Sequence, residues 1–359
     1  MHEAHEAGVR CMLMRGGTSK GLYLLRDELP TDEAERADLL RRLMGSPDRR
    51  QIDGLGGAHP LTSKVAVVAP AVGDDADVEY LFLQVGVDDR VVTDRQNCGN
   101  LLAGVGPFAI ERGLVQADGE VARMRIRMLN TGGVAVATFP LRDGRPSYHG
   151  GTAISGVPGT AARIDLEFED TAGATCGALL PTGNAVDEVG GLPVTCVDNG
   201  MPVVLLTASV LGLTGTESCE ELEADEDLRS TLGRVRLEAG VLMGLGDVTT
   251  TTVPKLTILA PPGGSGDVTT RTFIPHRCHS SIGVLGAVSV ATGCLVPGSV
   301  GHGVLRRGDE PGSITLEHPT GTITTTVELA GVDGQVTVRR AGIVRTARKL
   351  MDGIAFPSR

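Results

Sequence analysis

A single cysteine, Cys98, stands in the turn-forming run 96–100 (Gln-Asn-Cys-Gly-Asn). An apolar, glycine-dotted pattern follows it directly and predicts a helix from residue 101 to about 112. At a helix N-terminus, unpaired backbone N–H groups and the positive end of the helix dipole favour a thiolate over a thiol. The same groups favour a bound carboxylate. A core thiol is the alternative, but glycine and two asparagines would be unusual neighbours for one. The segment therefore indicates a base beside an anion site.

A second candidate for proton transfer is Lys64, which follows a glycine-containing turn at 56–63 and begins an apolar strand pattern over 65–69. A lysine partly removed from water at a strand end can act as a general base or as a cation that stabilises an enolate. The alternative is a surface lysine that protects the edge of a sheet from unwanted pairing. Position alone does not separate these two interpretations.

The run 14–21 (Met-Arg-Gly-Gly-Thr-Ser-Lys-Gly) combines glycines, hydroxyls and cations in a turn before the apolar residues 22–25. Successive backbone N–H groups in such a turn, together with Thr18 and Ser19, suit the binding of a carboxylate. An ordinary turn is the alternative.

Internal alignment indicates two copies of one unit. Residues 97–115 align without a gap on 278–296, and residues 22–25 align on 203–206 at the same offset of 181. A third pair, 63–70 and 254–261, keeps the order at an offset of 191. Chance similarity is the alternative in a chain so rich in Gly, Ala and Val.

In this alignment, His279 and Ser280 occupy the helix start that Cys98 and Gly99 occupy in the first copy. These side chains suit anion binding more than nucleophilic attack. A core or capping role is the alternative.

Strand patterns dominate the chain. Runs that are β-branched or alternating, separated by Gly, Pro or Asp, predict strands at 65–68, 78–87, 122–129, 134–139, 162–168, 202–208, 256–260, 313–317, 322–329 and 336–340. Helix patterns are fewer, at 32–44, 101–112, 225–245 and 282–291. The second and fourth of these are apolar on most faces, as expected of buried helices.

These elements predict an α+β protein of two pseudo-symmetric domains, each a strand-rich sheet or barrel around one apolar helix. The N-termini of both helices would face a cleft between the domains, where we expect the active site. We place the first domain at 1–185 and the second at 186–345. The linker is expected near 182–193, where Gly, Asn and Pro collect. A length of 359 residues suits two such domains.

The net charge of −11 and the pI near 5.2 argue against nucleic acid as a partner. The longest mainly apolar run, 201–213, is too short to cross a bilayer, and no apolar stretch follows the first residues. We therefore expect no membrane partner and a cytoplasmic location. Seven cysteines without CxxC spacing suit reduced thiols rather than a disulfide framework.

Metal and cofactor signals are weak. The run 276–279 (His-Arg-Cys-His) has no second ligand pair with zinc-like spacing elsewhere in the sequence, so no metal site is expected. The GxxxxGK[ST] motif and a strand-linked GxGxxG motif are also missing. We therefore expect no cofactor and a reaction carried out by side chains.

Seven motifs are spread over nearly the whole chain: MRGGTSKG at 14–21, QIDGLGG at 51–57, TSKV at 62–65, NCGN at 97–100, LLPTG at 179–183, HPTG at 318–321 and RTARKLM at 345–351. Together they resemble the PrpF family. That family includes 2-methylaconitate isomerases, 4-oxalomesaconate tautomerases and 3-methylitaconate Δ-isomerases, and it shares the two-domain diaminopimelate epimerase fold. Only the first and fourth motifs are specific by themselves.

The resemblance implies that Lys64 and Cys98 are the acid/base residues that flank the substrate. It also implies that the first glycine-rich turn and both central helix N-termini hold the carboxylates of the substrate. The residues assigned to this binding are Thr18, Ser19, Ser63, Asn97, Gly99, Asn100, His279 and Ser280. By the same resemblance, the segment 346–359 is expected to pack back on the first domain.

Epimerases of this superfamily use two facing cysteines, one from each half. In this chain the ungapped equivalent of Cys98 is His279, and the nearest thiol is Cys278. This departure argues against a two-thiol racemase, although a one-residue shift would make Cys278 the partner.

We therefore expect a cofactor-independent isomerase or tautomerase that moves a double bond in an unsaturated di- or tricarboxylic acid, such as 4-oxalomesaconate or 2-methylaconitate. Either Lys64 or Cys98 would remove a proton next to a carboxylate or keto group, and the dienolate would be reprotonated elsewhere. A cysteine-dependent racemase or epimerase and a non-catalytic carboxylate-binding protein are the alternatives. The expected partner is a small anionic polycarboxylate, and a homodimer stays open.

Overall fold

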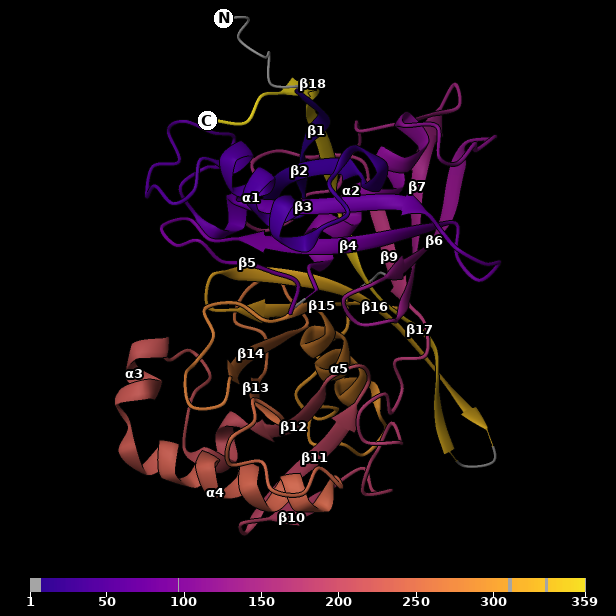
Figure 1. The fold of residues 1–359 in the computed structure, drawn as a ribbon. Helices are drawn as coiled ribbons and strands as arrows, with labels where there is room; N and C mark the ends of the chain where they lie inside the picture. Colours follow the sequence, from indigo (N-terminus) through magenta and orange to yellow (C-terminus); the bar gives the residue numbers. More distant parts are fainter. Residues whose placement is uncertain (1–7, 96, 309–311, 333–334, 359) are drawn as a thin grey trace, which may run out of the picture. The chain divides into compact units, whose positions relative to one another are not determined.

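The computed structural model describes residues 8–95, 97–308, 312–332 and 335–358 (Figure 1). Gln96, the first residue of the run before Cys98, lies outside them. The chain divides into two compact units, one of residues 1–166 with 345–359 and the other of residues 167–344. Residues 182–193, expected as a linker, instead carry β10 (Asp187–Val189) and the start of β11 (Leu192–Asp198), which pair with each other inside the second unit.

A mixed sheet forms the framework of the first unit. Its strands are β1 (Val9–Gly16), β2 (Ser19–Leu25), β3 (Lys64–Pro70), β4 (Val78–Val85), β5 (Val92–Thr93), β6 (Val121–Met128), β7 (Val134–Arg142), β8 (Arg145–Pro146) and β18 (Ala347–Ala355). β1 pairs antiparallel with both β18 and β2, and β2 runs parallel to β3. The sheet continues through β4, β6 and β7. The sequence boundary between the units, after residue 166, falls inside β9 (Ile164–Phe168).

Helix α2 (Gly99–Glu111) forms the core of the first unit. Nine of its residues are buried, as expected of a helix that is apolar on most faces, and it contacts β1, β2, β3 and β4. Gly104 lets the sheet approach closely, because a Cβ at this position would lie 2.5 Å from the Tyr23 hydroxyl oxygen. The opposite face of the sheet packs against α1 (Glu33–Met44), which begins at the Asp32 cap and buries Leu40, Leu43 and Met44.

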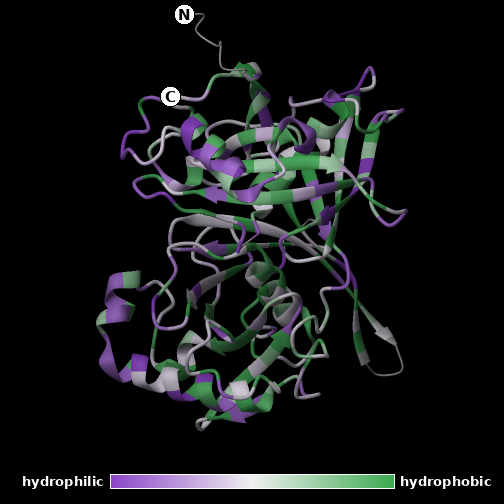
Figure 2. Ribbon diagram, viewed as in Figure 1, coloured by the Kyte–Doolittle hydropathy of each residue, from purple (hydrophilic) through white to green (hydrophobic). Residues whose placement is uncertain are grey.

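The second unit repeats this plan. Its strands are β10, β11, β12 (Pro202–Thr207), β13 (Lys255–Ala260), β14 (Val268–Phe273), β15 (Ser313–His318), β16 (Gly321–Val332) and β17 (Gln335–Arg345). Helix α5 (Val284–Leu295) has ten buried residues and contacts β11, β12, β15 and β16. Helices α3 (Cys219–Ala224) and α4 (Glu226–Leu242) share a hydrophobic cluster with residues of β11, β12 and β13. Both helices also carry hydrophilic stretches, which are purple in Figure 2.

The strand pairings support the predicted duplication. The series β1-β2-β3-β4-β6-β7 and the series β11-β12-β13-β14-β15-β16 both run antiparallel, parallel, antiparallel, parallel, antiparallel. Lys64 and Lys255 hold equivalent places in the two series. Lys64 is the first residue of β3, which runs parallel to β2, and Lys255 is the first residue of β13, which runs parallel to β12.

The ungapped alignment is nevertheless wrong at the central helices. The N-cap residues of α2 and α5 are Cys98 and Gly283, which lie 185 residues apart rather than 181. The N-cap position that Cys98 holds in α2 is therefore held by Gly283 in α5, and His279 lies in the turn before that helix.

No helix in the described part of the chain is both long and apolar enough to span a lipid bilayer.

Candidate active site

The tip of the β1–β2 hairpin meets the first turn of α2. Gly17 lies in the turn with a φ of +52°, and a Cβ there would lie 2.2 Å from Asn100 Oδ1, so glycine suits this position on both grounds. The Asn100 amide Nδ2 donates to Thr18 Oγ1 at 3.1 Å and to Ser19 Oγ at 3.5 Å. The structure thus brings three of the predicted binding residues, Thr18, Ser19 and Asn100, into one hydrogen-bonded cluster.

Cys98 is the N-cap of α2 and is 9% exposed. Its side chain does not cap the helix, so it leaves the N–H groups of the first turn to another acceptor. Its backbone is held on both sides, because the Cys98 N–H donates to Asn97 Oδ1 at 2.8 Å and the Tyr80 hydroxyl donates to the Cys98 carbonyl at 3.2 Å. The Asn97 amide also contacts Met128 Sδ, so Asn97 positions the cysteine.

Lys64 is 7% exposed at the start of β3. Its Nζ donates to Gln84 Oε1 at 2.7 Å and lies 4.8 Å from the centre of the Phe82 ring. The Gln84 amide cannot turn freely, since its Nε2 donates to the carbonyls of Ser63 at 2.9 Å and Pro60 at 3.1 Å. Gln84, which the sequence analysis missed, therefore fixes the position of the lysine ammonium group.

Ser63 has a different environment from that of a substrate ligand. It is fully buried, and its Oγ accepts from Gln51 Nε2 at 2.8 Å. This contact holds the turn that precedes Lys64. Ser63 therefore supports the backbone next to the lysine, and its own side chain does not reach solvent.

Arg345, the first residue of the RTARKLM motif, is a second residue whose role the sequence did not indicate. It belongs to the first unit, is 9% exposed, and its Nε donates to Asn100 Oδ1 at 3.1 Å. Burial lowers the pKa of Arg345 to about 10, and the charge of a Cys98 thiolate opposes that shift. A buried cation thus lies close enough to Cys98 to interact with its charge, and it also orients the Asn100 amide toward Thr18.

We expect replacement of Arg345 by methionine to lower kcat by about 10–100-fold, because a charge-assisted hydrogen bond contributes about 1.5–3 kcal/mol. Steady-state kinetics with thermal unfolding of the same samples would test this. Arg345→Lys keeps the charge and should recover part of the loss. Equal turnover in the methionine variant and the parent would exclude a positioning role.

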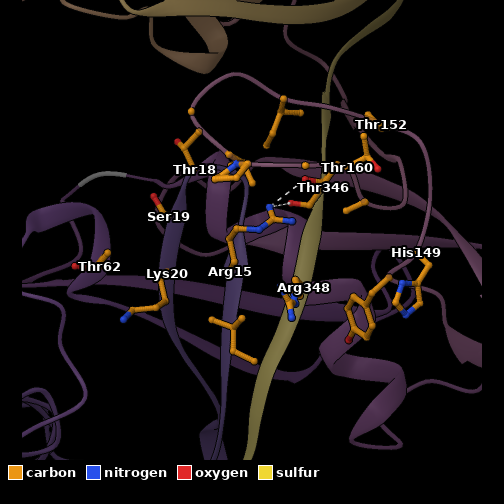
Figure 3. Close-up of a pocket in the computed structure, with 18 residues that line it drawn as sticks. Arg15, Thr18, Ser19, Lys20, Thr62, His149, Thr152, Thr160, Thr346 and Arg348 are labelled. Atoms are coloured by element: carbon orange, nitrogen blue, oxygen red, sulfur yellow. Dashed lines mark hydrogen bonds between the residues drawn. The ribbon is translucent and has the colours of Figure 1, made fainter.

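A cavity of about 630 Å³ opens on the first unit beside the hairpin (Figure 3). Lys20, Arg15 and Arg348 form a row across its wall, because Arg15 pairs with Lys20 of β2 on one side and with Arg348 of β18 on the other. Thr152 and Thr160 lie across from the row in Figure 3. Neither Lys64 nor Cys98 lines this cavity.

Among the described residues that line the cavity there is no aspartate or glutamate. Like charges on directly paired strand residues repel each other, and the pKa of Arg15 is lowered by its burial and by Arg348. A bound anion would relieve this repulsion.

In the second unit, the predicted residues His279 and Ser280 are exposed on the turn before α5. His279 Nδ1 accepts from the Ser281 N–H at 2.9 Å, and the Thr320 hydroxyl donates to the Ser280 carbonyl at 2.8 Å. Cys278 is buried in the hydrophobic core of this unit. Its Sγ lies 3.1 Å from the Sγ of Cys219, so this thiol faces a second cysteine inside the unit.

No group of three or more His, Cys, Asp and Glu side chains suited to a metal ion occurs in the ranges that the structure describes. The first unit carries a thiol at a helix N-terminus, a fixed ammonium group, backbone N–H donors and a row of cations. This set can exchange a proton with carbon and stabilise the resulting anion.

Comparison with known proteins agrees with that chemistry. The family model described as "PrpF protein" matches residues 7–357. The chain is 57% identical to the (4E)-oxalomesaconate Delta-isomerase of Novosphingobium sp. (strain KA1), with 96% of both chains covered. It is 56% identical to the 4-oxalomesaconate tautomerase of Pseudomonas putida, with 96% of this chain and 95% of that one covered.

Among solved structures, a crystal structure of methylitaconate-delta-isomerase matches with a TM-score of 0.88 and 34% identity, covering 98% of this chain and 96% of the other. The predicted α+β fold of two similar units is confirmed by this match and by the strand pairings.

Proposed function

The chain belongs to the PrpF family and is an isomerase of unsaturated carboxylic acids, and we propose that its substrate is 4-oxalomesaconate. The observation that carries this choice is the identity of 57% and 56% to two relatives named for that acid, across 96% of this chain. The relative named for 3-methylitaconate is 35% identical, and the relative named for 2-methyl-aconitate is 34% identical.

We propose that Lys64 and Cys98 transfer the proton. One of them removes a proton from a carbon next to a carboxylate or keto group, which forms a dienolate. The other returns a proton to a different carbon of the conjugated system, so the double bond moves and no other reactant is consumed. The fixed ammonium group of Lys64 and the N–H groups at the start of α2 suit the stabilisation of the developing negative charge.

The surroundings of Cys278 support this reaction over a two-thiol racemase. A racemase of that kind needs a second thiol that reaches the substrate, whereas Cys278 is buried in a hydrophobic core in contact with Cys219.

The experiment that tests the proposed function is NMR in D₂O of purified protein with 4-oxalomesaconate and, separately, 2-methylaconitate and 3-methylitaconate. We expect double-bond migration with deuterium incorporation, and the highest kcat/KM for 4-oxalomesaconate. A higher kcat/KM for either of the other acids would exclude the proposed substrate. Exchange at a saturated stereocentre without migration would exclude the reaction type.

The cationic row gives a separate prediction, because an anionic substrate should be attracted by Lys20, Arg15 and Arg348. We expect Arg348→Ala to raise KM about 2–5-fold at low salt with little change in kcat, since one solvent-accessible charge contributes at most about 1 kcal/mol. The effect should shrink in high salt. Arg339→Ala, at another exposed arginine, is the matched control. An unchanged KM in the Arg348 variant at low salt would rule out attraction by this row.

A further inference from the structure

Two cysteines from distant parts of the second unit meet in the structure. Cys219 is the first residue of α3, and Cys278 follows β14 by five residues. Their sulfur atoms lie 3.1 Å apart, and both are present as free thiols. Five further cysteines, also free, are found at 11, 98, 176, 196 and 294.

The backbone on each side of the pair is held in place. Ser218 forms a capping box with Glu221 at the start of α3, and this fixes the helix end that carries Cys219. On the other side, the Cys278 N–H donates to Glu223 Oε1 at 2.9 Å, and Cys278 forms a β-bridge with Phe273. Both thiols are therefore positioned by local structure, with their sulfur atoms in contact.

The two thiols differ in their access to solvent. Cys219 is half-buried, whereas Cys278 is 8% exposed and belongs to the core that also contains Phe273 and Leu222. A small reagent in solution therefore reaches Cys219 first. Cys278 then stands behind it as the nearest group able to react with an oxidised Cys219 sulfur.

We propose that Cys219 and Cys278 are a reversible modification site, at which a peroxide joins the two thiols as a disulfide. Hydrogen peroxide oxidises the Cys219 thiol to a sulfenic acid and is itself reduced to water. The Cys278 sulfur then attacks the Cys219 sulfur, the S–S bond forms, and the sulfenic oxygen leaves as a second water with the remaining thiol proton. An added dithiol reverses the reaction.

The disulfide would tie α3 to the segment that leads into α5. This site is independent of the proposed isomerase reaction, because neither thiol has a role in proton transfer. It is also distinct from the thiol of Cys98, which lies in the first unit.

The test treats the full-length protein with hydrogen peroxide, alkylates the remaining free thiols and digests with trypsin and a glutamate-specific protease. Mass spectrometry should find Cys219 and Cys278 in one linked peptide pair that dithiothreitol separates. Recovery of both residues in separate alkylated peptides would overturn the proposal. A link from Cys219 to a different cysteine, or Cys219 recovered only as a sulfinic acid, would overturn it as well.

Three variants make the test specific. Cys219→Ser and Cys278→Ser should each abolish the linked pair, and Cys278→Ser should leave a sulfenic acid at Cys219 that dimedone traps. Cys176→Ser, at another half-buried thiol of the same unit, should leave the link intact. Circular dichroism and turnover of Cys219→Ser confirm that the chain has folded. A link that persists in the Cys219 variant would show that other thiols are responsible.

Discussion

Replacement of Lys64 by methionine lowers kcat by about 10²–10⁴-fold, the range that general acid–base catalysis contributes. Methionine has a similar length and keeps apolar contact with Phe82, while it removes the ammonium group that Gln84 holds at 2.7 Å. The loss should therefore appear in turnover rather than in folding. The measurement is the initial rate of double-bond migration, followed by NMR or absorbance at saturating substrate.

The second unit supplies the matched control for this variant. Lys255 is the first residue of β13, as Lys64 is of β3, and it is half-buried. Lys255→Met removes an equivalent charge, and we expect it to stay within a few-fold of the parent. Turnover of Lys64→Met that also stays within a few-fold would refute the assignment of Lys64.

Replacement of Cys98 by serine should lower kcat by a similar factor of about 10²–10⁴, for a reason that leaves the fold intact. Serine is a favoured N-cap residue, so the start of α2 should be at least as stable with serine as with the cysteine, which provides no side-chain cap. The hydroxyl is a far poorer proton donor and acceptor than the thiol near neutral pH. Loss of activity with an unchanged or higher melting temperature is the expected pair of results.

Cys176→Ser controls for the loss of a half-buried thiol elsewhere. A Cys98→Ser protein with near-parental turnover would remove the thiol from the mechanism and leave Lys64 with a different partner.

The same two variants separate the base from the acid. In D₂O, a variant without the base should neither exchange the substrate hydrogen nor move the double bond. A variant without the acid should still exchange hydrogen at the carbon that loses its proton, although migration is slow. Partial exchange in one variant and none in the other therefore assigns the two steps.

The helices could be predicted well because their signals are local. The pattern at 32–44 is an amphipathic helix with an acidic first turn, and the structure has α1 at Glu33–Met44. The patterns at 101–112 and 282–291 correspond to α2 and α5, and that at 225–245 corresponds to α4. Continuous apolar faces and capping side chains lie within the segments themselves.

Several strands were missed because neighbours supply their stability. β18 (Ala347–Ala355) contains Arg, Lys, Asp and Gly and few β-branched residues, yet it pairs along its length with β1. β1 itself contains two Met, two Arg and one Cys, and only its last three residues were included in a prediction, as the start of the turn at 14–21. Strand propensity reflects packing with paired strands, and a single segment does not reveal its partners.

The residues of the candidate site could likewise be predicted where the signal is local and not where it depends on distant parts of the chain. Cys98 stood out because turn residues precede an apolar helix, and Lys64 because it begins an apolar strand. Gln84 carries no such local signal, and Arg345 stood out only as the first residue of the RTARKLM motif, with no role assigned to it. Each acts on a residue brought close by the fold, Gln84 on Lys64 across the β3–β4 pair and Arg345 on Asn100 of α2. The roles of His279 and Ser280 in substrate binding stay predictions.

The pairing of β1 with β18 determines the order in which the protein can be completed during synthesis. The ribosome makes β1 among the first strands and β18 only after the whole of residues 167–344 has been added. Until then, the edge of β1 that β18 later covers lacks its partner, and such an edge can pair with other chains. The second unit is continuous in sequence and does not have to wait for a distant strand. Closing a segment this long makes a late and slow folding step. The unit that leaves the ribosome first is therefore the one that is finished last.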